Sequence, residues 1–275
     1  MSSNAIFIGT AGMRLQSQKV SVLGNNIANS TSIAYKAGGM SFIDTYRGFT
    51  GQFANGNVKN VGNGIKVGNL FSDWNSGAVK ETGQAGNLAF NGDGFFHVQG
   101  SDGGNYYTRA GEFSLVEVGA TGTYTLMRPD GSQLMGSDGA APPAVPATAL
   151  MVFTDFPASW AIASNGAVTA VDGTGALITV NNPIVSAAVF SNMDGLVRED
   201  NGLYSDITGT AGITLGVPED ARGVGGIVQG ALEMSNVDLV NEFTDLVLTQ
   251  RAYSANSKTI TTASDMLQEV LNLKR

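Results

Sequence analysis

Few side chains in this sequence could carry out catalysis or bind a metal ion. The 275 residues include no Cys and a single His, His97. The absence of Cys excludes disulfides, thiolate metal ligands and Cys nucleophiles, and a single His excludes His clusters. His97 is therefore the one available base for a Ser-His-Asp triad. It follows two Phe residues in a predicted strand, where a His is more often structural than catalytic.

Three other motifs suggest chemistry but lack a necessary part of it. The glycine-rich stretch from Gly62 to Gly68 has no Gly-Lys-Ser/Thr ending, so we expect no nucleotide site there. The Asp-Gly pairs lack the alternating ligands and terminal Glu of a calcium loop and are expected to form turns. Asn29-Ser-Thr31 fits a glycosylation acceptor but falls inside a predicted helix end. The sequence thus predicts no cofactor, no metal site and no enzymatic activity.

The composition limits the classes of partner. Hydrophobic residues make up 43% of the chain, enough for a core, whereas the net charge of −8 provides no basic face for nucleic acid or anionic lipid. No window approaches 18 continuous apolar residues, so no membrane insertion is expected. The N-terminal residues lack the basic and apolar regions of a Sec-type signal. If the protein is exported, we expect export without a cleaved signal.

Residues 4–29 have the pattern of a helix with two apolar sides. One stripe repeats every seven residues and consists of Ile6, Met13, Val20 and Ile27. A second stripe has the same period and consists of Ile8, Leu15 and Val22. A surface helix has one apolar stripe. Such a helix is either buried inside an ordinary bundle or contacts one partner in its own chain and another in a neighbouring molecule.

Residues 236–275 predict a second long helix, since they contain neither Gly nor Pro. Five apolar residues recur every seven positions: Leu239, Leu246, Tyr253, Ile260 and Leu267. Phe243 and Leu271 flank this seam. The pattern is typical of a coiled-coil-like helix about 50–60 Å long. Polar residues in its middle make it marginal alone, so it needs other helices around it.

The residues between the two helices indicate a β domain. Asp-Gly and Asn-Gly pairs alternate with short apolar runs, which is the signature of β-hairpins. We therefore predict an α+β, mainly β, fold. Residues 1–33 and 236–275 would form a helical polymerisation domain, 34–69 an extended connector, and 70–235 a central β domain. A small insertion is expected at about 140–183.

Without a chemical site, assembly is the favoured function. Two helices that are apolar on several sides can pair with each other and with other copies, and a one-sided contact of that kind builds an open helical filament. We expect the apolar residues named above to form this interface. The amides of Asn25 and Asn29 share a helix face and are expected to bind a neighbouring chain segment. Asn26 would serve the backbone at the following turn.

Three motifs resemble the bacterial flagellar rod and hook proteins. The stretch LGNNIANSTSIAYK is similar to their N-terminal signature, although Ala34 stands where the family usually has Gly. LAFNGDGFFHV, residues 88–98, is similar to their hairpin motif at the start of the β domain. The C-terminal stretch from Gly230 to Arg275 resembles their C-terminal signature over its whole length. The three motifs occur in the family's order.

The resemblance implies a structural subunit of a helical tube, with the terminal helices inside and the β domain outside. Its implied partners are further copies, the neighbouring rod, hook and hook–filament junction proteins, the hook cap and the flagellar type III export apparatus. It also implies a location in the hook or basal body, outside the cell or spanning the periplasm. A family export element would fall at Phe7 and Ala11, where it fits poorly.

Within the family, ALEMSNVDL and LNLKR look more like hook proteins, whereas the chain length is that of a distal rod protein. We expect a short hook protein, the universal joint between basal body and filament. The alternative is a distal rod protein, part of the drive shaft. Outside the family, a monomeric β-sandwich binding module or a carbohydrate-acting enzyme remains as a remote alternative, and a monomer in sedimentation would favour either.

Overall fold

The structure is a computed structural model that describes residues 2–47, 61–118, 122–138, 148–207, 209–219 and 223–273. The chain divides into two compact units. The helical unit consists of Met1–Ser30, Lys36–Asp73 and Val237–Arg275. The β unit consists of Thr31–Tyr35 and Trp74–Asn236. Within the described residues no helix is long and apolar enough to cross a membrane.

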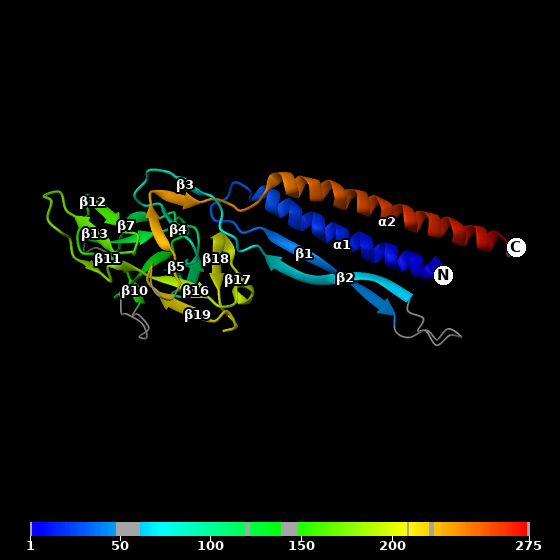
Figure 1. Cartoon of the computed structure of the whole chain (residues 1–275), viewed down its shortest axis with the longest axis horizontal. Coiled ribbons are helices and arrows are strands. Elements are labelled where there is room, and N and C mark those ends of the chain that lie inside the picture. The colour runs from blue at the N-terminus through cyan, green and yellow to red at the C-terminus, as the bar shows by residue number, and fades with distance from the viewer. Residues whose placement is uncertain are drawn as a thin grey trace. The chain divides into compact units, whose positions relative to one another are not determined.

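The helical unit contains the two predicted helices, α1 (Ser2–Ala28) and α2 (Leu239–Leu273). They lie side by side and antiparallel, so that both chain termini are at the same end of the pair (Figure 1). Asp238 caps α2, because its side chain accepts a 2.9 Å hydrogen bond from the N–H of Val240. A carboxylate at this position satisfies a free helix N–H and complements the helix dipole.

Residues 38–47 and 61–72 differ from the predicted connector. Strands β1 (Gly38–Arg47) and β2 (Val61–Ser72) pair as an antiparallel ribbon with two register shifts, between Met40 and Phe42 and between Asp44 and Tyr46. The prediction of an extended connector over 34–69 is wrong for these strands. Glycines and bulges interrupt the alternation of apolar and polar residues that normally reveals a strand, which explains the error.

The β unit is built from short strands joined by turns. Its first strands are β3 (Val79–Glu81), β4 (Leu88–Asn91), β5 (Phe95–Gln99), β6 (Asn105–Thr108), β7 (Ser114–Val118), β8 (Thr123–Met127) and β9 (Gln133–Ser137). Next come β10 (Thr148–Leu150), β11 (Val152–Phe153), β12 (Ser159–Ile162), β13 (Val168–Val171), β14 (Val180–Asn181), β15 (Ile184–Val185) and β16 (Ala187–Phe190). The last are β17 (Val197–Arg198), β18 (Leu203–Ser205), β19 (Ile213–Gly216), β20 (Gly226–Gln229) and β21 (Ala231–Glu233), with 3-10 turns at Met193–Gly195 and Asp200–Gly202.

Strand β5 lies at the centre of the main sheet. It pairs with β6 on one edge and with β9 and β16 in successive parts of the other. Every strand pairing among the described residues is antiparallel, as the hairpin signals predict. The main core includes the fully buried side chains of Phe96, Leu126 and Phe153. A smaller aromatic cluster joins Phe95 and Phe190, whose ring centroids are 5.0 Å apart.

The predicted insertion at 140–183 is wrong for most of the described residues in that range. Met151 and Phe153 are fully buried, and β10 and β11 pair with β9 and β8. The hairpin β12–β13 forms a two-stranded sheet of its own, but its Ile162, Val168 and Ala170 belong to the main core. The Pro-rich stretch 140–146, which suggested the insertion, lies outside the described residues. Apart from this range and the ribbon, the predicted α+β, mainly β, fold is confirmed.

Three segments meet at one edge of the β unit. Strand β21 pairs with β3, and Met234 forms a bridge with Ile33. Ala34 donates a 2.9 Å hydrogen bond to the carbonyl of Glu233. The backbone of Ala34 is left-handed, with φ +53°. This conformation favours Gly, so it explains why a Gly is usual at this position in the signature that the sequence resembles.

Candidate functional site

Helices α1 and α2 approach closely where α1 has no side chains. A Cβ placed on Gly9 would lie 2.7 Å from Cγ1 of Ile260, and one on Gly12 would lie 2.7 Å from Nδ2 of Asn256. Glycines at this spacing let a neighbouring helix pack against the backbone. The pairing of residues 9 and 12 with 260 and 256 also establishes the antiparallel register of the two helices.

Polar contacts hold the other end of the helix pair. The ammonium of Lys19 forms a 3.0 Å ion pair with Asp245. About one turn away from Asp245 on α2, Oε1 of Glu242 accepts a 3.0 Å hydrogen bond from the amide of Asn26. Oε2 of Glu242 is buried without a hydrogen-bond partner among the described residues. Burial therefore raises the pKa of the Glu242 carboxyl, and the Asn26 hydrogen bond opposes this only in part.

The asparagines exchange the roles that the sequence predicted for them. Asn26 is buried, and it bonds both polar groups of the Gly38 backbone, donating at 2.8 Å to its carbonyl and accepting at 2.9 Å from its N–H. Asn29 instead donates to the carbonyl and side-chain oxygens of Asn25 within its own turn. The prediction that Asn26 serves the local turn is wrong. The reason is that Asn26 shares the face of Gly12 and Lys19, which is turned toward α2.

The second apolar stripe of α1 is covered within its own chain. Ile8 lies next to Gly64 of β2, since a Cβ on that glycine would be 3.7 Å from the Ile8 Cα. Val22 similarly lies against Gly38 of β1. Leu15, between them in the stripe, is buried. The second partner of α1 in this structure is thus the β1–β2 ribbon, a contact that the sequence analysis had assigned to a neighbouring molecule.

The predicted interface residues divide into two groups by exposure. Those that are buried or half-buried are Ile6, Ile8, Met13, Leu15, Val20, Val22, Asn26, Ile27, Asn29, Leu246, Ile260 and Leu267. Those that are exposed are Asn25, Leu239, Phe243, Tyr253 and Leu271. Because a straight helix has 3.6 residues per turn, a strict seven-residue seam drifts around its surface. The five heptad positions of α2 therefore cannot all face α1.

The side of α2 turned away from α1 carries an apolar stripe, of which the sequence analysis named only Phe243. It consists of Val240, Phe243, Val247 and Leu248, all of them exposed. Phe243, Val247 and Leu248 line a shallow depression of about 340 Å³, edged by Arg251. The spacing of three and four residues along the helix could have revealed this stripe. An exposed apolar stripe of this kind marks an interaction surface.

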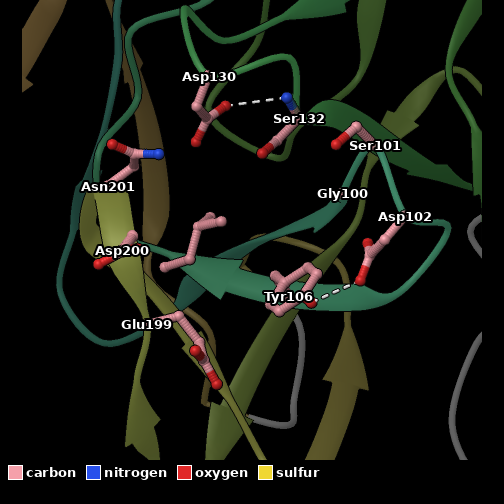
Figure 2. Close-up of a pocket in the computed structure, with 10 residues that line it drawn as sticks. Gly100, Ser101, Asp102, Tyr106, Asp130, Ser132, Glu199, Asp200 and Asn201 are labelled. Atoms are coloured by element: carbon pink, nitrogen blue, oxygen red, sulfur yellow. Dashed lines mark hydrogen bonds between the residues drawn. The ribbon is translucent and has the colours of Figure 1, made fainter.

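The β unit has a separate acidic pocket of about 230 Å³ (Figure 2). The carboxylates of Asp102, Asp130 and Glu199 in its lining already have partners. Asp102 accepts hydrogen bonds from the Gly104 N–H and the Tyr106 hydroxyl, which together lower its pKa. Asp130 pairs with Arg128. Among the described residues no three His, Cys, Asp or Glu side chains are grouped so that they could hold a metal ion.

His97 is a buried strand residue. Its Nδ1 lies 3.2 Å from the hydroxyl of Ser186, and its ring stacks on Tyr107 with centroids 5.3 Å apart. Burial lowers the pKa of His97 to about 4, with the neighbouring Asn105 side chain opposing that shift. A His and a Ser that are both closed off from solvent cannot meet a substrate. His97 is therefore a buried residue of the core, as expected for a structural His.

Known proteins resemble this chain along its whole length. Residues 89–189 match the model described as flagellar hook protein FlgE/F/G D1 domain, and residues 228–273 match flagellar basal body rod FlgEFG protein C-terminal. The flagellar basal-body rod protein FlgG of Bacillus subtilis (strain 168) is 35% identical over 278 residues, covering 98% of this chain and 99% of the relative. The chain belongs to the flagellar rod and hook protein family.

The family members that match this chain differ in how much of it they cover. The rod protein FlgG of Caulobacter vibrioides is 31% identical over 98% of this chain and 99% of its own length. The hook protein FlgE of the same organism is 46% identical, but over only 33% of this chain and 15% of its own length. Membership of the family identifies the chain as an axial structural protein of the flagellum. Both matched regions include residues of the β unit, and the C-terminal one also covers α2.

Proposed function

We propose that this chain is a structural subunit of the flagellar rod. The alignment with rod proteins over nearly the whole length of both chains carries the proposal. This proposal of a rod protein replaces the expectation of a hook protein, which was based on the C-terminal motifs. Those motifs could not separate the two classes, because the higher identity to a hook protein over 91 residues means that rods and hooks share part of their sequence.

The proposed activity is polymerisation, without catalysis. The contact with the next subunit would use the outward stripe of α2, since Val247 and Leu248 are exposed on a helix whose other side packs on α1. A surface of this kind that meets a different surface on the next copy produces an open helix of subunits. The helical unit would then form the polymer contacts.

Other parts of the proposal follow from family membership. Neighbouring axial proteins would contact the ends of the polymer, and the subunit would leave the cell through the flagellar type III export apparatus without a cleaved signal. Contacts with the hook cap and the hook–filament junction would apply only to a hook subunit. They therefore belong to the less favoured alternative.

Sedimentation of the purified chain tests polymerisation. Val247→Asp should abolish the sedimenting polymer and leave the helix unfolding transition within about 0.5 kcal/mol of the parent, since the residue is exposed in the subunit. Thr262→Asp, at another exposed position of α2, is the matched control and should polymerise. Immunogold labelling of isolated basal bodies then shows whether the protein is located in the rod or in the hook. Labelling of the hook alone would contradict the rod assignment.

A further inference from the structure

A buried ion pair lies where the chain passes between the two units. Arg109 Nη1 donates to Oε2 of Glu233 at 3.2 Å, and the two side chains are 2% and 1% exposed. Arg109 also donates at 2.9 Å to the carbonyl of Gly92, and its guanidinium lies 5.1 Å from the centre of the Phe95 ring. The arginine is thus part of the β unit's core, and it holds the carboxylate of Glu233 from that side.

Glu233 binds three chain segments at once. Its Oε1 accepts a 2.9 Å hydrogen bond from the N–H of Gly77, and its backbone carbonyl accepts one of 2.9 Å from Ala34. It is also the last residue of β21. The stretches 31–35, 74–79 and 233–236 are the parts of the β unit through which the chain enters and leaves it. One residue therefore connects all three stretches to the core.

The backbone segments next to Glu233 are closely packed. A Cβ on Gly77 would lie 1.9 Å from the carbonyl oxygen of Met234. The residues after Glu233 also bond to the other two stretches. The N–H of Met234 donates to the carbonyl of Ala78 at 2.9 Å, and the N–H of Asn236 donates to the carbonyl of Tyr35 at 3.3 Å. These stretches carry the covalent connections between the two units, so tension along the chain between the units passes through them.

We propose that Glu233 is a mechanical lock that keeps the three stretches fastened to the β unit under load. Separating the stretch 233–236 from the core withdraws the carboxylate of Glu233 from the buried guanidinium of Arg109, which is strongly unfavourable. It also breaks the hydrogen bonds that Gly77 and Ala34 donate to Glu233. The lock consequently opens as a whole. This inference concerns the connection inside one subunit, so it holds whether the subunit polymerises in a rod or in a hook.

Hydrogen exchange of the full chain, followed by mass spectrometry or NMR, tests the lock. In Glu233→Gln the amides of Ala34, Gly77 and Met234 should exchange about 10- to 100-fold faster than in the parent, while amides of β5 and β8 change much less. The matched control is Asp130→Asn, which removes the carboxylate charge that pairs with a second buried arginine, Arg128. It should leave those three amides protected.

A charge-free double variant covers the case in which Glu233→Gln does not fold. Arg109→Met with Glu233→Met removes both charges and keeps apolar volume in the core, an exchange that buried ion pairs often tolerate. It should fold and still show fast exchange at Ala34 and Gly77. Protection equal to the parent in this folded variant would overturn the proposal. So would exchange in Glu233→Gln that rises equally in the three stretches and in β5.

Discussion

The side-chain amide of Asn26 joins three parts of the helical unit, because it bonds the carboxylate of Glu242 at 3.0 Å and both backbone groups of Gly38. It therefore connects α1 to α2 and to the first residue of β1. A buried amide that satisfies three groups cannot be replaced by an apolar side chain without leaving those groups unpaired.

Asn26→Leu should destabilise the helical unit although Leu is the better helix former. Each buried group left without a partner costs about 1–3 kcal/mol. Urea unfolding followed by far-ultraviolet circular dichroism measures the loss. Asn25→Leu is the control, since Asn25 is exposed, and it should change stability by no more than about 0.5 kcal/mol. Equal effects of the two substitutions would contradict the contacts described for Asn26.

Stability of the helix pair should depend on the protonation of Glu242. Burial raises the pKa of this carboxyl above its ordinary value of 4.5, so the folded state holds the proton more tightly than the unfolded state. Stability is then greatest at low pH and falls as the pH rises through the raised pKa. Glu242→Gln should remove this dependence and stabilise the pair at neutral pH. Thermal melts at several pH values measure both effects, and an unchanged pH profile in the variant would be the contrary result.

Gly9→Leu should force the helices apart. Its side chain would overlap Ile260, and overpacking of this kind costs about 1–3 kcal/mol. Gly24→Leu is the matched control, because a Cβ at Gly24 meets nothing within 4 Å. The control should be neutral or slightly stabilising, given the poor helix propensity of Gly. The melting temperatures of the two variants should therefore move in different directions.

The β unit should lose stability in mild acid through His97. The pKa of this side chain falls from 6.5 to about 4 on folding, so the unfolded state binds the proton first as the pH drops. The loss begins near pH 6.5 and reaches about 3 kcal/mol at pH 4. His97→Phe keeps a ring against Tyr107 and should flatten this part of the profile. Intrinsic fluorescence during urea unfolding gives the measurement.

Ala34→Gly should stabilise the β unit. A left-handed Ala destabilises the folded state by about 1–2 kcal/mol, and Gly removes this strain. Gly also gives the unfolded chain more conformational freedom, which offsets the gain in stability by about 0.5–1 kcal/mol. A net gain of about 0.5–1 kcal/mol is expected. Ala149→Gly changes an exposed residue of β10 in the same unit, at a position outside the left-handed region, and provides the comparison, with a loss expected. A loss in both variants would contradict the strain at residue 34.

Local patterns predicted most of the elements. Continuous helical periodicity without Gly or Pro identified α2, and turn dipeptides identified the hairpins: Gly92, Gly131 and Gly166 all have positive φ. The β1–β2 ribbon escaped notice because bulges break its alternation. The pairing of Arg109 with Glu233 joins residues 124 positions apart. No local pattern encodes such a pairing, which depends on the completed fold.

The interface predictions were limited in the same way. Seven-residue spacing finds apolar residues but not the direction in which a helix turns them. Ile8 and Val22 face a ribbon that the sequence did not reveal, whereas Val247 and Leu248 lie outside the heptads and are exposed. Which residues meet a neighbouring subunit thus remains a prediction. The interior contacts of α1 and α2 are described by the structure.

The division of the helical unit over three stretches of chain determines the order in which the protein can fold. The partner of α1 is α2, and nearly the whole β unit lies between them. Closing so large a loop is entropically costly and slow, whereas the hairpins of the β unit join neighbouring residues. A chain that emerges with its N-terminus first therefore carries α1 without its helical partner until α2 arrives. The α1–α2 pair accordingly forms only after the whole chain has emerged. A chain that is interrupted before α2 lacks this pair and cannot join a growing polymer through it.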